Sequence, residues 1–539
     1  MRAPRIHPWL CVAALLIGVA GAAGPVRAAV RGPEMAALRE AQRLIHELRV
    51  EEAAAVLAPF DKNNGPEFEL VRGTLAFHQG DYEGAARRLR SGLAAVRLPA
   101  ADVQELRSLI ELATATADLT RGFVEQKTSG GHFLIRYRPG PDEVLVPHAG
   151  DALEQAYTAL ATDFSGVGDA GAAKPSAPIR VEIYGEIADL ARVSTLTLKE
   201  IETSGTIALC KWNRLMIVSP RALTRGYPWL DTLTHEYTHF IVSRVSRNTV
   251  PIWLHEGLAK FEEQRWRGPS GGGLPPSQEH LLTQALQKKR FITFEQMYPS
   301  MAKLPSQEDT ALAFAEVYTV VEYLHQRAGW PGLRKLIAAM AGGAGDARAV
   351  AATLGVSFAD FDRSWKAWLR TRKPHGKGVA LTPKLKFKKG SGQKDSEDDD
   401  SGEISDVRAR NFARLANMLR ERRRLTAAAV EYEKAQALVG PQNPFVAHKL
   451  ARTYLELGDL DRAVAAAEPA AELYPELSGL SVTLGGAYLK KGELARAAAL
   501  FESANRVNPF DPAIHCGLAR AYSERRPAAA PALIQREER

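Results

Sequence analysis

Residues 229–264 of this 539-residue chain read WLDTLTHEYTHFIVSRVSRNTVPIWLHEGLAKFEEQ. His235 and His239 are four positions apart, so on a helix their imidazoles point the same way, about 6 Å apart. Two neutral imidazoles at that spacing can bind one zinc ion. Glu236 would lie beside the metal, where it can act as a general base. The same motif also fits a surface helix that binds no metal.

A second helix is expected to follow at once. Asn248 tolerates the left-handed conformation that ends a helix, and Pro251 can begin the next one. The segment PIWLHEGLAKF is then at the right distance to fold back beside the first helix and bring an acid to the metal. We expect that acid to be Glu256, with Gly257 allowing close approach between helices.

HEYTHF followed by PIWLHEGLAKF resembles the gluzincin zinc peptidases, and in particular the peptidase MA-like domains, whose pattern is HExxH and then W-L-x-E-G-x-A-x-Y. The resemblance implies an α+β, zincin-like catalytic domain over residues 129–373, with a mixed sheet and active-site helices. It also implies that His235, His239 and Glu256 bind Zn²⁺ and that Glu236 is the general base of peptide-bond hydrolysis.

Two departures from the family pattern concern the groups around the metal. Phe261 replaces the usual tyrosine, and Lys260 stands where the family often has an acid. A carboxylate at that position could have oriented a ligand histidine through its free N–H. We therefore expect Asp231, one turn before His235, or Glu263 to take that role.

The group that stabilises the oxyanion is a further open point. Phe314 stands where relatives often carry a tyrosine, which leaves Tyr318 and His325 as candidates. His255 is expected on another side of its helix, as a neighbour of the ligands or a surface group. A peptide substrate could add as an extra strand to an edge expected at residues 215–218.

The order of predicted elements supports an α+β arrangement. Residues 132–138 (HFLIRYR), 179–184 (IRVEIY) and 215–218 (LMIV) have the alternating or clustered apolar pattern of short strands. Helical patterns follow from Trp229 onward. Strands first and helices later are typical of an α+β domain.

The C-terminal part of the chain is repetitive. Four leucines recur 35, 34 and 34 residues apart, at Leu415, Leu450, Leu484 and Leu518. Small residues at fixed offsets after these leucines let two helices approach closely. Residues 409–526 resemble the tetratricopeptide repeat (TPR), which implies all-α helical hairpins that bind a protein partner or substrate. Residues 527–539 are left as a tail.

Two further regions flank the catalytic domain. Residues 29–128 look like a weaker version of the same repeat, with Gly73 and Gly80 at TPR-like offsets and a plain helical hairpin as the alternative. Residues 374–408 carry lysines and then acids, with few apolar groups. Such a segment cannot offset the entropy of ordering itself, so we expect a disordered linker.

The first residues have the pattern of a secretory signal peptide. Arg2 and Arg5 precede an uncharged, mostly apolar run, and small residues around Ala28 offer a cleavage site. We therefore expect residues 1–28 to be removed and the protein to be exported to a bacterial periplasm or secreted. An uncleaved N-terminal membrane anchor is the alternative. No later stretch is long and apolar enough to span a membrane.

Composition narrows the function classes. The formal charge is +8, and loss of residues 1–28 would remove three arginines and no acid, leaving +5. That value is ordinary for this length and argues against a nucleic-acid partner. Cys210 and Cys516 fall in different predicted domains, so a disulfide framework is not expected. The sequence thus predicts an exported zinc metallopeptidase with protein-binding repeats, and the alternative is an inactive scaffold that retains a peptidase-like fold.

Overall fold

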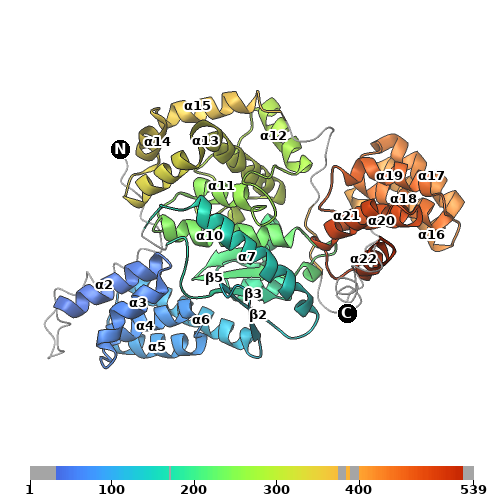
Figure 1. Ribbon diagram of the computed structural model, residues 1–539. Helices are drawn as coiled ribbons and strands as arrows, with labels where there is room; N and C mark the ends of the chain where they lie inside the picture. Colours follow the sequence, from blue (N-terminus) through green and yellow to red (C-terminus); the bar gives the residue numbers. More distant parts are fainter. Residues whose placement is uncertain (1–31, 169–171, 374–383, 389–399, 526–539) are drawn as a thin grey trace.

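A computed structural model describes residues 32–168, 172–373, 384–388 and 400–525. The predicted signal peptide and C-terminal tail lie outside the described residues. Along the chain the structure has a group of helices, a mixed domain with one sheet, and a stack of helical hairpins (Figure 1). No described helix combines the length and apolar character needed to cross a membrane.

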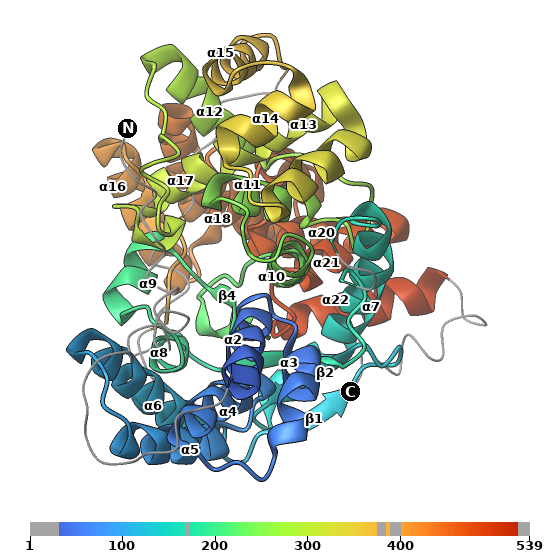
Figure 2. The same cartoon turned by 90° about the vertical axis from the view of Figure 1, so that its left-hand side faces the viewer.

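The N-terminal helices lie below the sheet in the view of Figure 1, and Figure 2 turns this side of the molecule toward the viewer. Their bounds are α2 (Gly32–His46), α3 (Val50–Leu57), α4 (Pro66–Gln79), α5 (Tyr82–Ala95) and α6 (Ala100–Thr120). Gly73 of α4 lets α5 approach closely, because an added Cβ would lie 2.7 Å from the Leu89 side chain. Gly80 ends α4 in the left-handed conformation, with a φ of 84°.

The central sheet has five strands in the order β1-β2-β3-β5-β4. Their bounds are β1 (Val124–Lys127), β2 (Phe133–Tyr137), β3 (Ile179–Tyr184), β4 (Ala208–Lys211) and β5 (Arg214–Val218). Strands β2, β3 and β5 run parallel, and β1 and β4 pair antiparallel at the two edges. This mixed sheet among helices confirms the predicted α+β class.

The strand at residues 215–218 is not an edge, so that expectation is wrong. It belongs to β5, which pairs with β3 on one side and β4 on the other. Trp212 and Asn213 connect β4 to β5 with φ angles of 54° and 59°. Two positive φ angles are typical of a tight hairpin turn, which folds β4 back outside β5. The open edge on this side is therefore β4.

The two faces of the sheet are covered by different parts of the chain. On one face lie α7 (Leu145–Asp163) and α10 (Trp229–Val245), and the rings of Phe133 and Tyr237 meet there with centroids 5.0 Å apart. The other face meets the N-terminal helices. Two short helices, α8 (Ile187–Arg192) and α9 (Leu198–Ser204), connect β3 to β4. The sheet thus separates the N-terminal helices from most of α10 (Figure 1).

A buried carboxylate fastens the N-terminal helices to the sheet. Glu182 of β3 accepts hydrogen bonds from the hydroxyls of Tyr82 and Tyr184 at 2.6 Å and from the guanidiniums of Arg136 and Arg214 at 2.7 Å. Burial raises the pKa of Glu182, but the two guanidiniums outweigh that effect and hold the pKa below its ordinary value. Tyr82 lies in α5, so the cluster joins residues 100 positions apart.

The helices that follow α10 form a layer on its other side (Figure 1). Their bounds are α11 (Ile252–Glu262), α12 (Pro276–Lys288), α13 (Gln307–Ala341), α14 (Asp346–Leu354) and α15 (Phe358–Leu369). Gly257 does allow a close approach, and its partner is α13: an added Cβ would lie 2.8 Å from the Val317 carbonyl oxygen. The helix α10 is therefore enclosed between the sheet and α11.

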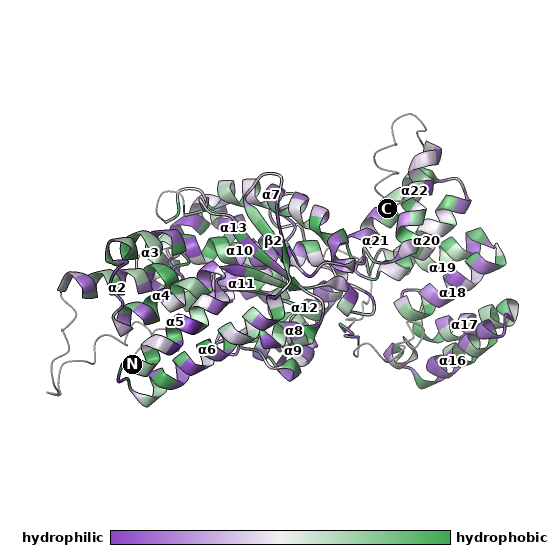
Figure 3. Cartoon of the chain, turned by 90° about the horizontal axis from the view of Figure 1, so that it is seen from below, coloured by the Kyte–Doolittle hydropathy of each residue, from purple (hydrophilic) through white to green (hydrophobic). Residues whose placement is uncertain are grey.

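The C-terminal part forms the predicted helical hairpins. The helices are α16 (Val407–Glu421), α17 (Leu425–Val439), α18 (Pro444–Leu457), α19 (Leu460–Ala471), α20 (Ser478–Lys490), α21 (Leu494–Asn505) and α22 (Pro512–Arg525). The small residues Ala416 and Ala451 are fully buried, and Gly485 lies against the Phe501 ring. The helices carry apolar and polar residues on different sides (Figure 3), as expected of stacked hairpins.

The structure differs from the predicted disordered linker at residues 384–388. This segment lies on the domain that contains the sheet and forms an isolated β-bridge between Phe387 and Leu223: the N–H of Lys388 donates to the Ala222 carbonyl at 2.8 Å, and the N–H of Thr224 donates to the Lys386 carbonyl at 3.0 Å. Leu385 and Phe387 pack against the domain core. These two apolar side chains offset the entropy of ordering that the lysine-rich composition could not.

The repeats contact the loop between β5 and α10. The N–H of Tyr227 donates to the Val507 carbonyl at 3.1 Å. The hydroxyl of Ser478 donates to the Arg225 carbonyl at 3.3 Å. The Arg225 guanidinium lies 4.8 Å from the ring centroid of Phe445. Repeat residues at the starts of α18 and α20 and in the loop after α21 therefore contact the segment that leads into α10.

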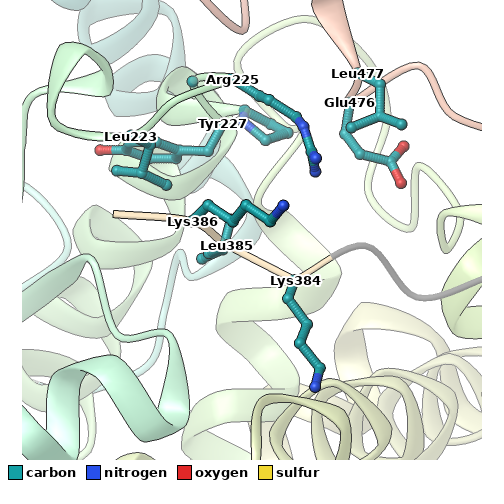
Figure 4. Close-up of a pocket in the computed structure, with 10 residues that line it drawn as sticks. Leu223, Arg225, Tyr227, Lys384, Leu385, Lys386, Glu476 and Leu477 are labelled. Atoms are coloured by element: carbon teal, nitrogen blue, oxygen red, sulfur yellow. The ribbon is translucent and has the colours of Figure 1, made fainter. Parts of the chain in front are cut away.

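A small, partly open pocket lies at this junction (Figure 4). Arg225 and Tyr227 line it from the domain that contains the sheet, Lys386 lines it from the linker segment 384–388, and Glu476 and Leu477 line it from the repeats. The repeats thus contact the domain that contains the sheet, beside the loop that leads into α10.

Loss of the Arg214 guanidinium should destabilise the sheet. In Arg214→Met, Arg136 is the one cation left beside the buried Glu182 in this cluster, so we expect the free energy of unfolding to fall by about 3 kcal/mol. Urea denaturation measures the loss. The matched control is Arg88→Met, which removes a more exposed ion pair with Glu69 and should cost less than about 1 kcal/mol. If the two variants lost equal free energy of unfolding, the buried cluster would contribute no more to stability than the more exposed ion pair.

Gly226→Ala should separate the repeats from the catalytic domain. Gly226 has a φ of 68°, and a Cβ there would lie 2.3 Å from the Val507 carbonyl oxygen. We expect a larger radius of gyration in small-angle scattering. Gly122→Ala is the matched control, because Gly122 has a φ of 84° with no atom within 4 Å of its added Cβ. A scattering profile that Gly226→Ala leaves unchanged would show that these contacts do not hold the repeats.

Candidate metal centre

The helix that carries the two histidines is buried nearly throughout. It begins after Pro228, and its residues from Leu233 to Val245 are all buried. His235 and His239 are 8% and 9% exposed. The helix is therefore buried and not on the surface, as the alternative had it. The polar groups on it need partners in the interior.

Three side chains meet in the geometry of a metal site. The Nε2 atoms of His235 and His239 lie 3.4 Å and 3.2 Å from an oxygen of Glu256. Four-coordinate zinc, with bonds of about 2.0–2.1 Å, places its donor atoms roughly 3.3 Å apart. Among the residues that the structure describes, no other set of three His, Cys, Asp or Glu side chains comes together in this way. The donor set of two imidazoles and a carboxylate fits Zn²⁺.

The turn between α10 and α11 brings Glu256 to the histidines. Arg247 and Asn248 have φ angles of 53° and 56°, so the predicted left-handed end of the helix extends over two residues. The N–H of Asn248 donates to the Ser243 carbonyl at 2.7 Å. Pro251 then precedes α11, whose second turn presents Glu256. This tight reversal is why an acid 17 positions after His239 can reach it.

Charges in the site match metal binding. Burial lowers the pKa of His235 to about 4, so this imidazole is neutral and has a free lone pair. Burial raises the pKa of the Glu256 carboxyl, but the two histidines outweigh that effect and hold it well below its ordinary range. A neutral imidazole and an ionised carboxylate are the forms that bind a metal.

Glu236 is placed beside these ligands and next to the sheet edge. It is buried, and its carboxylate is hydrogen-bonded by the backbone of Cys210 in β4. Burial raises the pKa of Glu236 to about 7. A carboxyl group with a pKa near neutrality can both take up and release a proton at physiological pH. The backbone of Cys210 as its partner was not expected, because strand pairing decides which residue lies there.

Of the two acids expected behind His235, the structure brings Glu263 to it. The Glu263 carboxylate lies 3.9 Å from His235 Nδ1, with Lys260 Nζ 2.6 Å from its other oxygen. Asp231 is engaged elsewhere: its carboxylate accepts from Trp266 Nε1 at 2.8 Å and from the Arg267 guanidinium at 2.7 Å.

The prediction for Asp231 is therefore corrected. Spacing along α10 correctly placed it one turn before His235, but two donors from the loop after α11 take both of its oxygens. Tertiary contacts of that kind leave no local sign in the sequence.

His255 lies directly behind His239. The two Nδ1 atoms are 2.5 Å apart, and the ring centroids are 4.6 Å apart with an interplanar angle of 27°. On its other side, His255 Nε2 lies 3.1 Å from the hydroxyl of Ser243. Of the two roles expected for this residue, neighbour of the ligands or surface group, the structure shows the first.

The structure does not bring the two candidate oxyanion residues to the centre. The Tyr318 hydroxyl accepts the N–H of Gly273 at 3.1 Å, and the rings of Tyr318 and His325 both lie against Phe261, with centroids 5.7 Å and 5.3 Å away. The ring beside His235 is that of Phe314, at 5.7 Å. Tyr318 and His325 are about 6 Å and 16 Å further along α13, which corrects the prediction.

Comparison with known proteins finds a family for two parts of the chain. Residues 160–371 match the Peptidase MA superfamily, and residues 455–521 match the tetratricopeptide repeat family. A solved structure of a thermophilic TPR protein from Thermus thermophilus is 28% identical, with a TM-score of 0.20, over 22% of this chain and 65% of its own length. No curated protein matches the chain. The chain thus contains a Peptidase MA superfamily domain followed by tetratricopeptide repeats.

Proposed function

We propose that this chain is an exported zinc-dependent metallopeptidase that hydrolyses peptide bonds in a protein or peptide substrate. The observation that carries the proposal is the meeting of His235, His239 and Glu256 at the spacing of zinc donors, with Glu236 beside them. Export rests on the signal-peptide pattern of residues 1–28.

The four residues of the site would have different roles in the reaction. His235 and His239 would hold the metal through Nε2, and Glu256 would hold it through a carboxylate oxygen. A zinc ion bound there supplies a Lewis acid that activates water and polarises a carbonyl group. Glu236 takes the proton released by the attacking water and delivers it to the leaving amine. Its bond to the backbone of Cys210 fixes the carboxylate for both transfers.

The edge of the sheet suggests how a peptide would lie. Strand β4 pairs with β5 on one side, and α10 lies beside it. An extended peptide that added to the open edge of β4 would gain main-chain hydrogen bonds. Because Cys210 of that strand also binds Glu236, such a peptide would run past the proton-transfer group.

The repeats would bring a protein to the same place. Burial raises the pKa of Glu476, in a repeat loop, to about 7, and the nearby Lys260 of α11 opposes that rise. Arg506 of another repeat loop interacts electrostatically with Arg267 and Asp231. The loop side of the repeats therefore lies near the ends of α10 and α11. A partner or substrate held by the repeats would be close to the metal centre.

One observation favours the second candidate function, a binding protein that retains an inactive peptidase fold. The ring next to His235 is the apolar Phe314, and neither Tyr318 nor His325 reaches the centre. A peptidase needs hydrogen-bond donors or a cation where negative charge develops in the transition state. In this chain the metal itself would have to meet most of that need.

Glu236→Gln tests the proposal against this alternative. The amide cannot accept the proton, so we expect cleavage of fluorescently labelled casein to fall by at least about 100-fold while zinc content stays at the wild-type level. Glu262→Gln is the matched control, because Glu262 is also buried in this region and burial raises its pKa to about 8. Unchanged cleavage in Glu236→Gln would exclude the mechanism. A zinc-loaded wild type that cleaves nothing would support the binding protein.

A further inference from the structure

His255 and Ser243 form a hydrogen-bonded chain behind one of the expected ligands. His255 Nδ1 lies 2.5 Å from His239 Nδ1, and His255 Nε2 lies 3.1 Å from Ser243 Oγ. Ser243 is four residues after His239 on α10, so both face α11 on the same side of the helix. The imidazole of His255 fits between them from the neighbouring helix.

The geometry allows one set of proton positions. His239 presents Nε2 to Glu256 at 3.2 Å, so in the metal-bound form Nε2 has no proton and Nδ1 carries it. His239 Nδ1 then donates to His255 Nδ1, which must accept. His255 therefore carries its own proton on Nε2 and donates it to the hydroxyl of Ser243. Each tautomer in the chain follows from the one before it.

We propose that His255, held by Ser243, is a positioning residue that fixes the tautomer and ring orientation of His239. The proposal rests on the metal site of the proposed function. A metal-binding histidine needs a partner for its second ring nitrogen, and loss of that partner typically weakens metal binding 10- to 100-fold. His239 has an imidazole in that position, whereas the nearest such group to His235 is the carboxylate of Glu263.

A neutral acceptor suits the charge of this site. Glu236 and Glu256 already place two carboxyl groups next to the histidines, and Glu263 adds a third that is paired with Lys260. A further carboxylate behind His239 would need its own cation in a buried place. An imidazole accepts the hydrogen bond of His239 without adding charge.

Packing is the competing role for His255, since its ring stacks on His239 with an interplanar angle of 27°. Two substitutions separate the roles. His255→Phe keeps an aromatic ring and removes both hydrogen bonds. His255→Asn removes the ring and keeps an acceptor, because Asn Oδ1 and His Nδ1 are both attached to Cγ.

The experiment measures zinc affinity by competition with a chromogenic chelator, together with the unfolding midpoint of the metal-free proteins. We expect His255→Phe to bind zinc 10- to 100-fold more weakly with a nearly unchanged metal-free midpoint, and His255→Asn to stay within about threefold of the wild type. Ser243→Ala should weaken binding by a smaller factor, and it keeps the test decisive if His255→Phe does not fold.

Two results would overturn the inference in different ways. If the wild type binds zinc, and His255→Phe and Ser243→Ala bind it as tightly, His255 has a packing role and this inference alone fails. If the folded wild type binds no zinc, the proposed function fails and the inference fails with it.

Discussion

The burial of α10 is the constraint on which the rest of the structure depends. This helix carries His235, Glu236 and His239 into the interior, where an unpaired polar group costs free energy. Each of these three side chains therefore has a polar partner in the interior. The two imidazoles face Glu256, the Glu236 carboxylate is bonded by the backbone of Cys210, and further polar side chains stand behind the ligands. A divalent cation would complete such a cluster, because it would bind the two Nε2 atoms and the carboxylate oxygen that face one another.

The flanking regions hold the same helix from its two ends. Near the C-terminal end, the Arg244 guanidinium donates to the carbonyl of Leu48, in the segment that joins α2 to α3. Before the N-terminal end, the loop containing Tyr227 is hydrogen-bonded to the repeats. The Peptidase MA superfamily domain is therefore set between two helical regions, one in contact with α10 and the other with the loop that leads into it. The repeats thus contact the loop that leads into α10, the helix that carries the candidate metal ligands.

Local patterns predicted the parts of the site that are close in sequence. Spacing placed the histidines on one helix face, Asn248 and Pro251 marked the turn, and the short separation brought Glu256 back. The repeats were equally clear from their period. The remaining features depend on tertiary contacts. The order of the strands makes β4, and not β5, the edge of the sheet. Side chains from the loop after α11 donate hydrogen bonds to Asp231. Two apolar residues of the charged linker pack against the core and order part of it. These contacts join segments that are far apart in the sequence, so a local pattern does not predict them.

The central claim is that α10 and α11 together hold one zinc ion. The most direct measurement is anomalous diffraction at the zinc edge from crystals of the mature chain prepared without chelator. The account predicts one peak per chain, about 2.0–2.2 Å from Nε2 of His235, Nε2 of His239 and an oxygen of Glu256. A well-ordered structure with no peak there, or with zinc bound only elsewhere, would contradict the claim.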